Sequence, residues 1–296
     1  MKRIFISFFA LCAGISMMAS EPGSEAFGFA RIDFDPASAG MGGANLANPQ
    51  SVSYAAFGNV AMIPFSSSKV SADASYMKWA PASADCSGIS AGASFSLGKL
   101  GVALGYLSNS YAHVDKYDPK DNMMALGLAF KLSAKLSVGV NGKYASQIFT
   151  SKQSFSGVLA DVYVAGKWDS LTASAGVSSI GGKVSLNNKD EFAAPASFRL
   201  GAGYQMAISE SQSVLALADI DYYFSGAFSF AAGAQYGFKD MLFARAGYRY
   251  GGQSVLGSYM SLGLGVKFAC IALNANYLLA SDTLGGSMSF GLGVRF

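Results

Sequence analysis

Residues 286–296, GSMSFGLGVRF, decide the fold. The apolar residues of this stretch share one parity: Met288, Phe290, Leu292, Val294 and Phe296. The other parity holds only Ser, Gly and Arg295. This two-residue period is typical of a strand with one apolar face and one small or polar face. Because chain ends are usually polar and frayed, an apolar strand at the last residue predicts that this strand pairs with another and closes a sheet.

The composition is that of a chain with too few charges for a water-exposed surface. Hydrophobic residues make up 51% of it and charged residues 13%, against about 25% charged residues in soluble domains. Beyond the N-terminus no run of about 18 apolar residues could form a spanning helix. A closed barrel is the other structure that satisfies every backbone group in lipid. We therefore expect an all-β, transmembrane antiparallel β-barrel; the net charge of +3 gives no reason to expect nucleic-acid binding.

Alternating segments of strand length repeat from about residue 70 to the end. We expect fourteen strands, beginning near Val70, Ile89, Leu100, Met123, Leu136, Val158, Leu171, Ser197, Val214, Ala227, Met241, Tyr259, Ile271 and Ser287. Fourteen strands place short turns at one end and long loops at the other, and the expected long loops include residues 149–157 and 180–195. Twelve and sixteen are the other even counts. A soluble sandwich also alternates, but the second parity here is mostly Gly, Ala and Ser, which suits a crowded lumen.

The first twenty residues, MKRIFISFFALCAGISMMAS, are predicted to be a secretory signal peptide (1–20). They combine a basic start, an apolar centre and small residues at the end. An uncleaved anchor helix and a lipoprotein site at Cys12 are the alternatives. Export predicts the outer membrane of a Gram-negative bacterium as the location. Cys86 and Cys270 fall at opposite ends of the predicted barrel, so we expect no disulfide between them.

Residues 21–68 break the alternation and contain four of the seven prolines. Proline is excluded from central strands, and the segment is not charged enough to be disordered. We expect it to lie in the lumen as a plug, with residues 69–296 forming the barrel. A flexible periplasmic extension is the alternative.

The end of the chain also resembles the signal that outer-membrane assembly machinery reads. The residues that match are Ser289, Gly291, Val294 and the final aromatic Phe296. The resemblance implies that this strand directs insertion of the barrel.

A second resemblance lies in the plug, where Gly40, Met41, Gly42, Gly43 and Ala44 are followed by Asn59. This pattern is similar to the N-terminal part of the PorV/PorQ family, distant relatives of the FadL-like superfamily. Where the family has Asn-Pro-Ala, this chain reads Asn59-Val60-Ala61, which alters the local turn. The first strand, with Tyr76, Trp79 and Pro81, is also similar. The resemblance implies a fourteen-stranded barrel with an N-terminal hatch.

Three functions follow from the resemblance. The first is a non-enzymatic partner barrel in type IX protein secretion or surface protein assembly. Its expected partners are outer-membrane lipid, a larger outer-membrane channel or assembly complex, and exported protein cargo. The second is a FadL-like channel for small hydrophobic molecules, and the third is a scaffold subunit of another outer-membrane complex. The predicted lumen of Gly, Ala and Ser lacks bulky apolar residues, which places the channel second.

Charged residues of the inward parity are expected to line the lumen. They are Lys143, Asp161, Lys167, Arg199, Asp219, Asp221, Arg245, Arg249, Lys267 and Arg295, together with Asp73. We expect them to pair with each other and with Asp33 or Asp35 of the plug. Selection of anions is the alternative role.

Neither catalysis, a cofactor nor a metal is predicted. The one histidine, His113, lies in a loop beside Asp115, Asp118 and Asp121. No oriented nucleophile or oxyanion site accompanies it, and the aspartate spacing does not match a twelve-residue calcium loop.

Overall fold

The computed structural model describes residues 25–48, 50–81, 85–113, 118–150, 153–186, 190–251, 257–280 and 284–296. The predicted signal peptide lies outside these residues. The fourteen barrel strands are β1 (Val70–Trp79), β2 (Cys86–Leu97), β3 (Leu100–Ser110), β4 (Lys120–Lys131), β5 (Leu136–Thr150), β6 (Gln153–Trp168), β7 (Leu171–Gly181), β10 (Ser197–Ser209), β11 (Gln212–Tyr223), β12 (Phe228–Phe238), β13 (Leu242–Gly251), β14 (Tyr259–Phe268), β15 (Ile271–Ala280) and β16 (Met288–Arg295).

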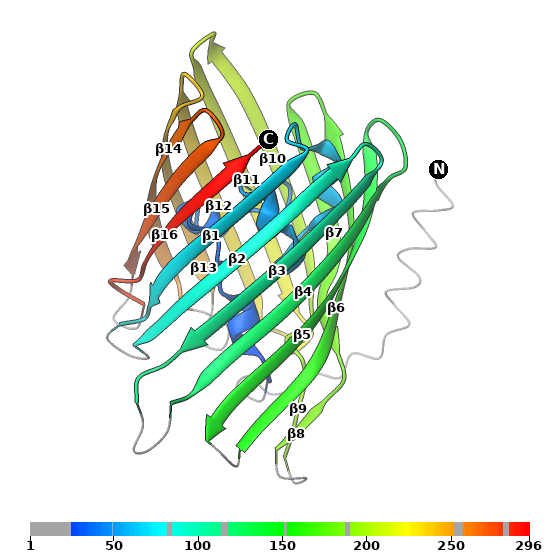
Figure 1. The fold of residues 1–296 in the computed structure, drawn as a ribbon, viewed down its shortest axis with the longest axis vertical. Helices are drawn as coiled ribbons and strands as arrows, with labels where there is room; N and C mark the ends of the chain where they lie inside the picture. Colours follow the sequence, from blue (N-terminus) through cyan, green and yellow to red (C-terminus); the bar gives the residue numbers. More distant parts are fainter. Residues whose placement is uncertain are drawn as a thin grey trace.

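These strands form one closed antiparallel barrel, as the sequence predicts (Figure 1). Closure occurs between β1 and β16, with Ser71 opposite Arg295 and Lys78 opposite Met288. Phe296 extends this ladder, because its N–H donates to the carbonyl oxygen of Val70 over 2.8 Å. The last strand therefore completes the wall and leaves neither β1 nor β16 as an open edge.

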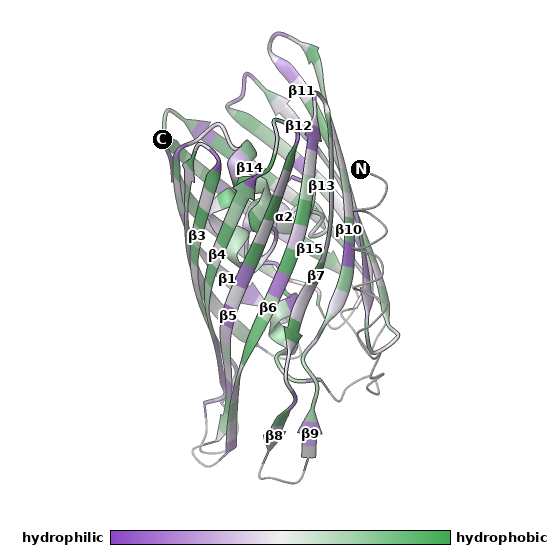
Figure 2. Cartoon of the chain, turned by 90° about the vertical axis from the view of Figure 1, so that its right-hand side faces the viewer, coloured by the Kyte–Doolittle hydropathy of each residue, from purple (hydrophilic) through white to green (hydrophobic). Residues whose placement is uncertain are grey.

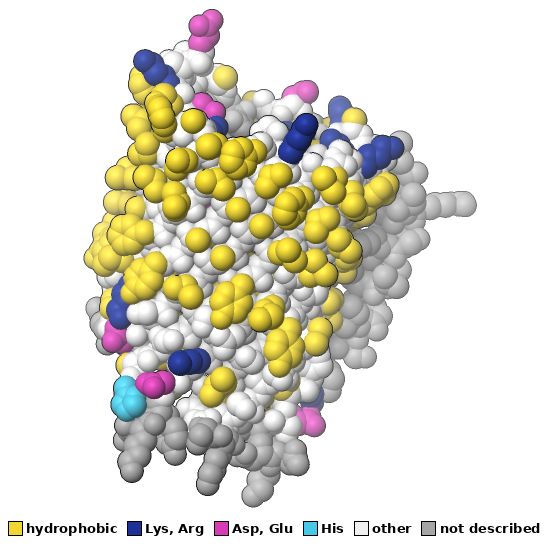
Figure 3. All heavy atoms as spheres, in the orientation of Figure 1, with side chains coloured by type: hydrophobic (Ala, Val, Ile, Leu, Met, Phe, Trp, Pro, Cys, Tyr) yellow, Lys and Arg dark blue, Asp and Glu magenta, His cyan; other side chains and the backbone are white. Residues whose placement is uncertain are grey.

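The alternating residues face opposite sides of the wall. Along β14, Met260, Leu262 and Leu264 are exposed on the outside, whereas Ser261 is buried on the inside. Figure 2 shows hydrophobic positions alternating with paler ones along the strands, and Figure 3 shows hydrophobic side chains spread over the wall with charges mainly at its two ends. This is the surface that a barrel presents to lipid.

The two ends of the barrel differ in their connections. One end, at the top of Figure 1, carries the tight turns between β2 and β3, β4 and β5, β6 and β7, β10 and β11, β12 and β13, and β14 and β15; we call it the turn end. The opposite end is the loop end. Cys86 lies at the loop end and Cys270 at the turn end, and both thiols are free.

Two predicted loops are wrong. The stretch FTSKQSFSG (149–157) is mostly strand, because β5 and β6 extend to Thr150 and from Gln153. The predicted loop 180–195 contains a small hairpin, β8 (Val184–Leu186) with β9 (Asp190–Phe192). Seven strands begin at the residue predicted from the sequence, and four of them, β3, β5, β7 and β15, follow a tight turn.

Residues of the N-terminal segment occupy the lumen (Figure 1). They form three 3-10 helices, η1 (Gly28–Arg31), η2 (Val52–Phe57) and η3 (Val60–Phe65), and a short α-helix, α2 (Pro36–Ala39). We call residues 25–65 the plug. Among the described residues, no helix is both long enough and apolar enough to cross a membrane.

Candidate functional site

The plug runs from the loop end of the barrel to the turn end. At the loop end, the Ala26 N–H donates to the carbonyl oxygen of Ala193 over 2.8 Å. Phe27 follows with a positive φ of 57°, and its N–H donates to Oε1 of Gln147 on β5 over 2.7 Å. At the turn end, Lys131 Nζ on β4 donates to the carbonyl oxygen of Pro64 over 3.3 Å. The plug is therefore attached to the wall at both ends.

Helix α2 is fixed by Asp35, which caps its N-terminus. The Asp35 carboxylate accepts the N–H of Ala37 over 3.1 Å and the hydroxyl of Ser38 over 2.7 Å. It also accepts the hydroxyl of Ser51 over 3.0 Å, from the segment that leads into η2. Pro36 at the first helical position removes a donor that would have no partner there. One carboxylate thus joins two parts of the plug.

The glycine-rich motif 40–44 packs directly on the wall. Gly40 faces Gly263 on β14, where an added Cβ would lie 2.9 Å from the Gly263 Cα. Gly42 has a φ of +73°, and a Cβ there would lie 2.7 Å from the backbone of Tyr248. Both the close approach and the left-handed backbone require glycine at this position. Three further motif residues complete the contact with the wall: Met41 lies against the wall glycines at 233 and 247, Gly43 lies beside Arg249, and Ala44 is buried with Leu215, Leu217 and Ala231.

Asn59 holds the second half of the plug together. Its side chain accepts the N–H of Ala61 over 3.1 Å and so caps η3. Its amide donates to the carbonyl oxygen of Leu46 over 2.7 Å and to the hydroxyl of Ser174 on β7 over 3.0 Å. Asn59 therefore ties η3 both to the first half of the plug and to the wall.

Most of the predicted lumen charges form buried ion pairs on the inner wall. Lys143 and Asp161 approach to 2.6 Å, and both are almost completely buried. Asp221 receives two guanidinium groups, from Arg199 at 2.6 Å and Arg249 at 2.8 Å. Two residues outside this paired set bind neutral groups: Arg245 donates to Gln235 and Asn274, and Asp219 accepts the N–H groups of Asn45 and Leu46. Arg295 lies 3.5 Å from Asp73.

Two of the predicted lumen charges lie at the rim. Lys167 is exposed at the turn end, and Lys267 pairs there with the exposed Asp240 over 3.1 Å. The inward parity of the strand continues to the rim, where the lumen opens at the turn end. Lys167 thus lines a small cavity at the turn-end mouth of the lumen with Met62 and Phe65 of the plug, and Lys267 is half-buried at the same rim.

The predicted ion pairs between the wall and the plug aspartates are also absent: within the described residues, neither Asp33 nor Asp35 has a basic group within 4 Å. Asp33 instead accepts the side-chain amide of Asn45 over 2.8 Å. Burial, and then the neighbouring charge of Asp35, raise the pKa of Asp33 to about 7. This carboxyl is thus the plug group that changes charge near neutral pH.

The plug binds to the wall charges through its backbone. Lys143 Nζ donates to the carbonyl oxygen of Phe57 over 2.9 Å, and Asn141 donates to that of Gly58. Asp161 accepts from both Lys143 and Asn141, and also from the N–H of Ser179 over 2.8 Å. A single wall carboxylate therefore orients the donors that hold the middle of the plug.

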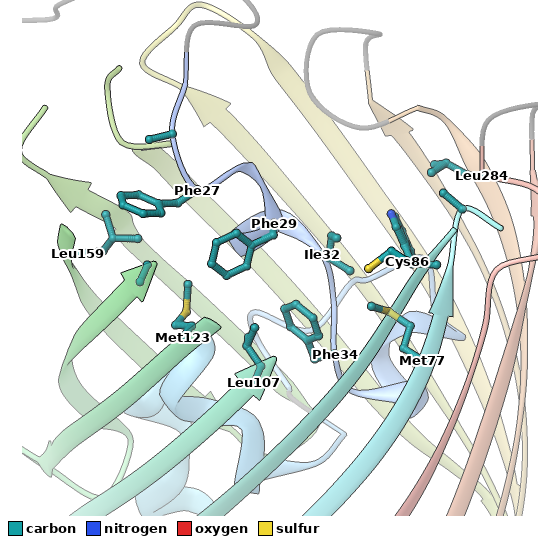
Figure 4. Packing of buried hydrophobic residues seen from close by; sticks show 14 of the residues in the cluster. Phe27, Phe29, Ile32, Phe34, Met77, Cys86, Leu107, Met123, Leu159 and Leu284 are labelled. Atoms are coloured by element: carbon teal, nitrogen blue, oxygen red, sulfur yellow. The ribbon is translucent and has the colours of Figure 1, made fainter. Parts of the chain in front are cut away.

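Toward the loop end, the side of the lumen lined by β1–β6 and β15 is apolar, which corrects the prediction of a lumen of Gly, Ala and Ser; we call it the apolar half, and the Arg199–Asp221–Arg249 cluster lies across the lumen from it on β10, β11 and β13. Figure 4 shows Phe27, Phe29, Ile32 and Phe34 of the plug close to wall residues of the inward parity. Those wall residues include Met77, Trp79, Leu107, Met123, Leu159 and Leu278. Their positions near the loop ends of their strands were visible in the sequence, but the alternation analysis weighted the more numerous small residues.

A cavity of about 90 Å³ separates the plug from the wall. Its apolar lining includes Phe34, Phe57, Leu107 and Met123, and its polar lining includes Asp33 and the Arg199–Asp221–Arg249 cluster. The cavity thus lies at the boundary between the apolar and the charged halves of the lumen.

The wall is interrupted beside this cavity. Strand β7 pairs with β10 only from Leu171 to Ser178, and its register with β6 shifts between Ala160 and Val162. Ser179 has a φ of 55° at this bulge. Ser178, Ser179 and Pro195 all line the cavity. Toward the loop end, the hairpin β8–β9 and residue 193, rather than a β7–β10 ladder, lie next to the plug.

The four residues of the predicted assembly signal lie on β16 or at its end. Ser289 is buried and hydrogen-bonds Asn276 on β15, Gly291 faces Pro36 of the plug, Val294 is half-buried, and Phe296 is exposed beside Val70. At the loop end, His113 lies 2.7 Å from Asp118 and both are exposed; Asp115 lies outside the described residues. No cluster that could hold a metal occurs in the described part of the chain.

Known structures share this architecture at low sequence identity. The toluene transporter TbuX of Ralstonia pickettii superposes with a TM-score of 0.61 over 90% of this chain and 100% of its own, at 12% identity. The CymD monoaromatic hydrocarbon channel gives 0.62 over 90% and 98%, also at 12% identity. A Pseudomonas aeruginosa FadL homologue gives 0.51 over 86% and 98%, at 12% identity.

No family model and no curated protein sequence matches the chain. At these identities the likeness concerns the fold, and each of the three structures is matched over nearly its full length. The chain therefore has the barrel fold of the toluene transporter, the monoaromatic hydrocarbon channel and the FadL homologue.

Proposed function

We propose that this protein is an outer-membrane channel of the FadL-like superfamily that passes small hydrophobic molecules, with the plug as its hatch. The observation that carries the proposal is a closed fourteen-stranded barrel that holds its own N-terminal segment in the lumen, beside a partly apolar cavity. The transporter and channel named above share this fold over most of their length. We infer from the same fold and from the apolar outer wall that the protein is integral to the outer membrane.

The apolar half of the lumen provides the binding surface that this function needs. A hydrophobic molecule arriving from the loop end meets the aromatic side chains of the plug and then Leu107 and Met123 at the cavity. The wall interruption between β7 and β10 lies next to the cavity and provides a lateral route to the lipid phase.

The size of the cavity limits what it holds in this state. An apolar cavity of about 150 Å³ accommodates benzene, and the cavity here measures about 90 Å³. A monoaromatic molecule would therefore have to displace plug side chains such as Phe34 or Phe57. Binding and movement of the plug are coupled in this proposal.

The partner barrel of protein secretion becomes the second candidate. The sequence favoured the partner barrel over the channel because the predicted lumen lacked bulky apolar residues. The structure contains such residues in the apolar half of the lumen, so this preference no longer holds. The comparisons favour the channel, since the solved structures with this fold include a transporter and a channel for small hydrophobic molecules.

Two neighbouring methionines on β4 provide the test. Met123 lines the cavity at 2% exposure, whereas Met124 faces outward at 61% exposure. Met123→Trp should fill the cavity and reduce toluene uptake at least severalfold in cells that produce the protein, while Met124→Trp should leave uptake unchanged. Equal uptake with and without the protein would refute a channel. A large outer-membrane protein that co-purifies in equal amount would instead support the partner barrel.

A further inference from the structure

A row of polar side chains crosses the apolar half of the lumen near the loop end. Asn109 on β3, Asp121 on β4 and Gln147 on β5 face inward and lie opposite one another in register, and we call them the polar row. The next inward pair toward the turn end is Leu107 with Met123, and both line the cavity. Because successive inward residues of a strand lie about 7 Å apart, the polar row begins one such step beyond the cavity.

Two members of the polar row are engaged in hydrogen bonds. Gln147 Nε2 donates to Asp121 over 3.0 Å, and Gln147 Oε1 accepts the N–H of Phe27 in the plug over 2.7 Å. The other oxygen of Asp121 accepts the hydroxyl of Tyr111. These bonds join the row to the plug without using Asn109, the third member.

Asn109 is completely buried, and its amide is unpaired. In the described part of the chain it is the only side-chain amide whose nitrogen and oxygen are both buried without a hydrogen-bond partner. Its Oδ1 lies over Gly88 on β2, where an added Cβ would overlap it, and the Met77 methyl lies 3.3 Å from the same point. Burial of an amide among apolar groups costs free energy. Such a group is poised to pair with a ligand that enters the lumen.

We propose that Asn109 selects phenols, monoaromatic molecules with a neutral hydroxyl group, among the small hydrophobic molecules that the channel passes. This inference rests on the channel function proposed above and names its substrate class. A phenolic hydroxyl both donates and accepts, so it pairs with Oδ1 and Nδ2 of the same amide. A hydrocarbon leaves the amide unpaired. A site with a hydrogen-bonding group for a substrate hydroxyl discriminates against the analogue without one for this reason.

The ring of the ligand takes the place of Phe34 in the plug. Figure 4 shows Phe34 between Leu107 and Met77, and all three belong to one buried apolar cluster. The cavity of about 90 Å³ is smaller than the space that benzene occupies, so a ring enters only when Phe34 moves. The space that Phe34 leaves runs from the cavity toward Met77, beside the Asn109 amide.

The polar row also excludes ligands with a carboxylate. Asp121 lies opposite Asn109 and is 3% exposed. Within the described residues no basic group lies within 4 Å of Asp121. Two neighbouring carboxylates disfavour each other's charge, so an aromatic acid at Asn109 would be bound less well than a neutral phenol.

The test compares p-cresol with p-xylene, which share ring and shape and differ by a hydroxyl in place of one methyl. Equilibrium dialysis of the labelled molecules against the full-length barrel in lipid nanodiscs, with empty nanodiscs as the blank, gives two dissociation constants. Their ratio is the readout, because the difference in hydration between the two molecules is the same for every variant. Asn109→Leu should shift the ratio toward p-xylene by roughly tenfold, the contribution of one or two hydrogen bonds.

Two further variants control for packing and folding. Asn109→Ala adds no bulk and should shift the ratio in the same direction. Asn122→Leu is the matched control, since Asn122 is an amide at the same end of β4 but on the outward parity, and it should leave the ratio unchanged. Retained binding of p-xylene by the Asn109 variants shows that they are folded.

Failure of this inference differs from failure of the channel. If both molecules bind and neither Asn109 variant changes the ratio, Asn109 does not select the ligand and its amide pairs with buried water. An equal shift in Asn122→Leu would also overturn the role of Asn109, and binding of p-methylbenzoate as tightly as p-cresol would overturn the neutral class. If the unmodified protein binds neither molecule, the channel is refuted and the inference with it.

Discussion

Gly247 on β13 and Met41 in the plug are in backbone contact: a Cβ added to Gly247 would overlap the carbonyl carbon of Met41. Gly247→Ala should therefore push the plug away from the wall and lower the free energy of unfolding by about 1–3 kcal/mol, the usual cost of overpacking. The measurement is the temperature at which the barrel loses its compact mobility in gel electrophoresis, together with the rate of protease cleavage in the plug.

Gly142→Ala is the matched control, because nothing lies within 4 Å of a Cβ at Gly142. It should behave as the unmodified protein in both measurements. If Gly247→Ala also matched the unmodified protein, the plug would not rest on this part of β13.

Asp161→Asn should destabilise the barrel strongly, because it leaves the Lys143 ammonium buried without its carboxylate. Loss of one partner of a buried pair costs about 3–5 kcal/mol. Replacing both residues, with Lys143→Gln added, should recover part of that loss, since no buried charge then remains. A double-mutant cycle from unfolding free energies measures the coupling, and purely additive losses would show that the two side chains do not interact.

The stability of the plug should depend on pH through Asp33. Its pKa is about 7 in the folded protein and 3.8 when exposed, so between these values the folded state binds more protons than the unfolded state. The free energy of unfolding should therefore fall as the pH rises from about 4 to about 7. Protease cleavage of the plug at several pH values measures the trend. Asp33→Asn cannot ionise and should reduce the slope of the trend; an unchanged slope in this variant would assign the effect to another group.

Phe296→Ala should reduce the amount of barrel that reaches the outer membrane, if the C-terminal residues direct assembly. Its side chain is 68% exposed, so the stability of barrels that do fold should change little. Phe290→Ala, which removes another outward aromatic ring from β16, is the control and should leave the yield unchanged. Quantifying folded protein in outer-membrane fractions tests both variants, and equal losses would argue against a role specific to the last residue.

The barrel could be predicted from the sequence because its rule is local. Each strand alternates with a period of two, and tight turns such as 132–136 fix where the next strand begins. The lumen position of residues 25–65 was also predictable, since their prolines and missing period exclude them from the wall. Gly42 both meets the wall and has a positive φ, two requirements that favour glycine in the motif.

The partners of individual side chains were not predictable. Which carboxylate meets Lys143 depends on the register of β5 against β6, which places Asn141 opposite Asp161. The apolar half of the lumen depends on height within the barrel and on which strands face each other across it, and alternation gives neither. Leu107 and Met123 come together only because both lie near the loop end, on adjacent strands.

The two attachments of the plug limit how a passage can open. The plug is hydrogen-bonded to the wall at Ala26 and is covalently continuous with β1 at its other end, so it cannot leave the lumen as a free body. The connector 66–69 has four residues and reaches at most about 14 Å when extended. A passage must therefore form by rearrangement of the plug between its two attachment points. The length of the plug, rather than the strength of one contact, then limits the width of the passage.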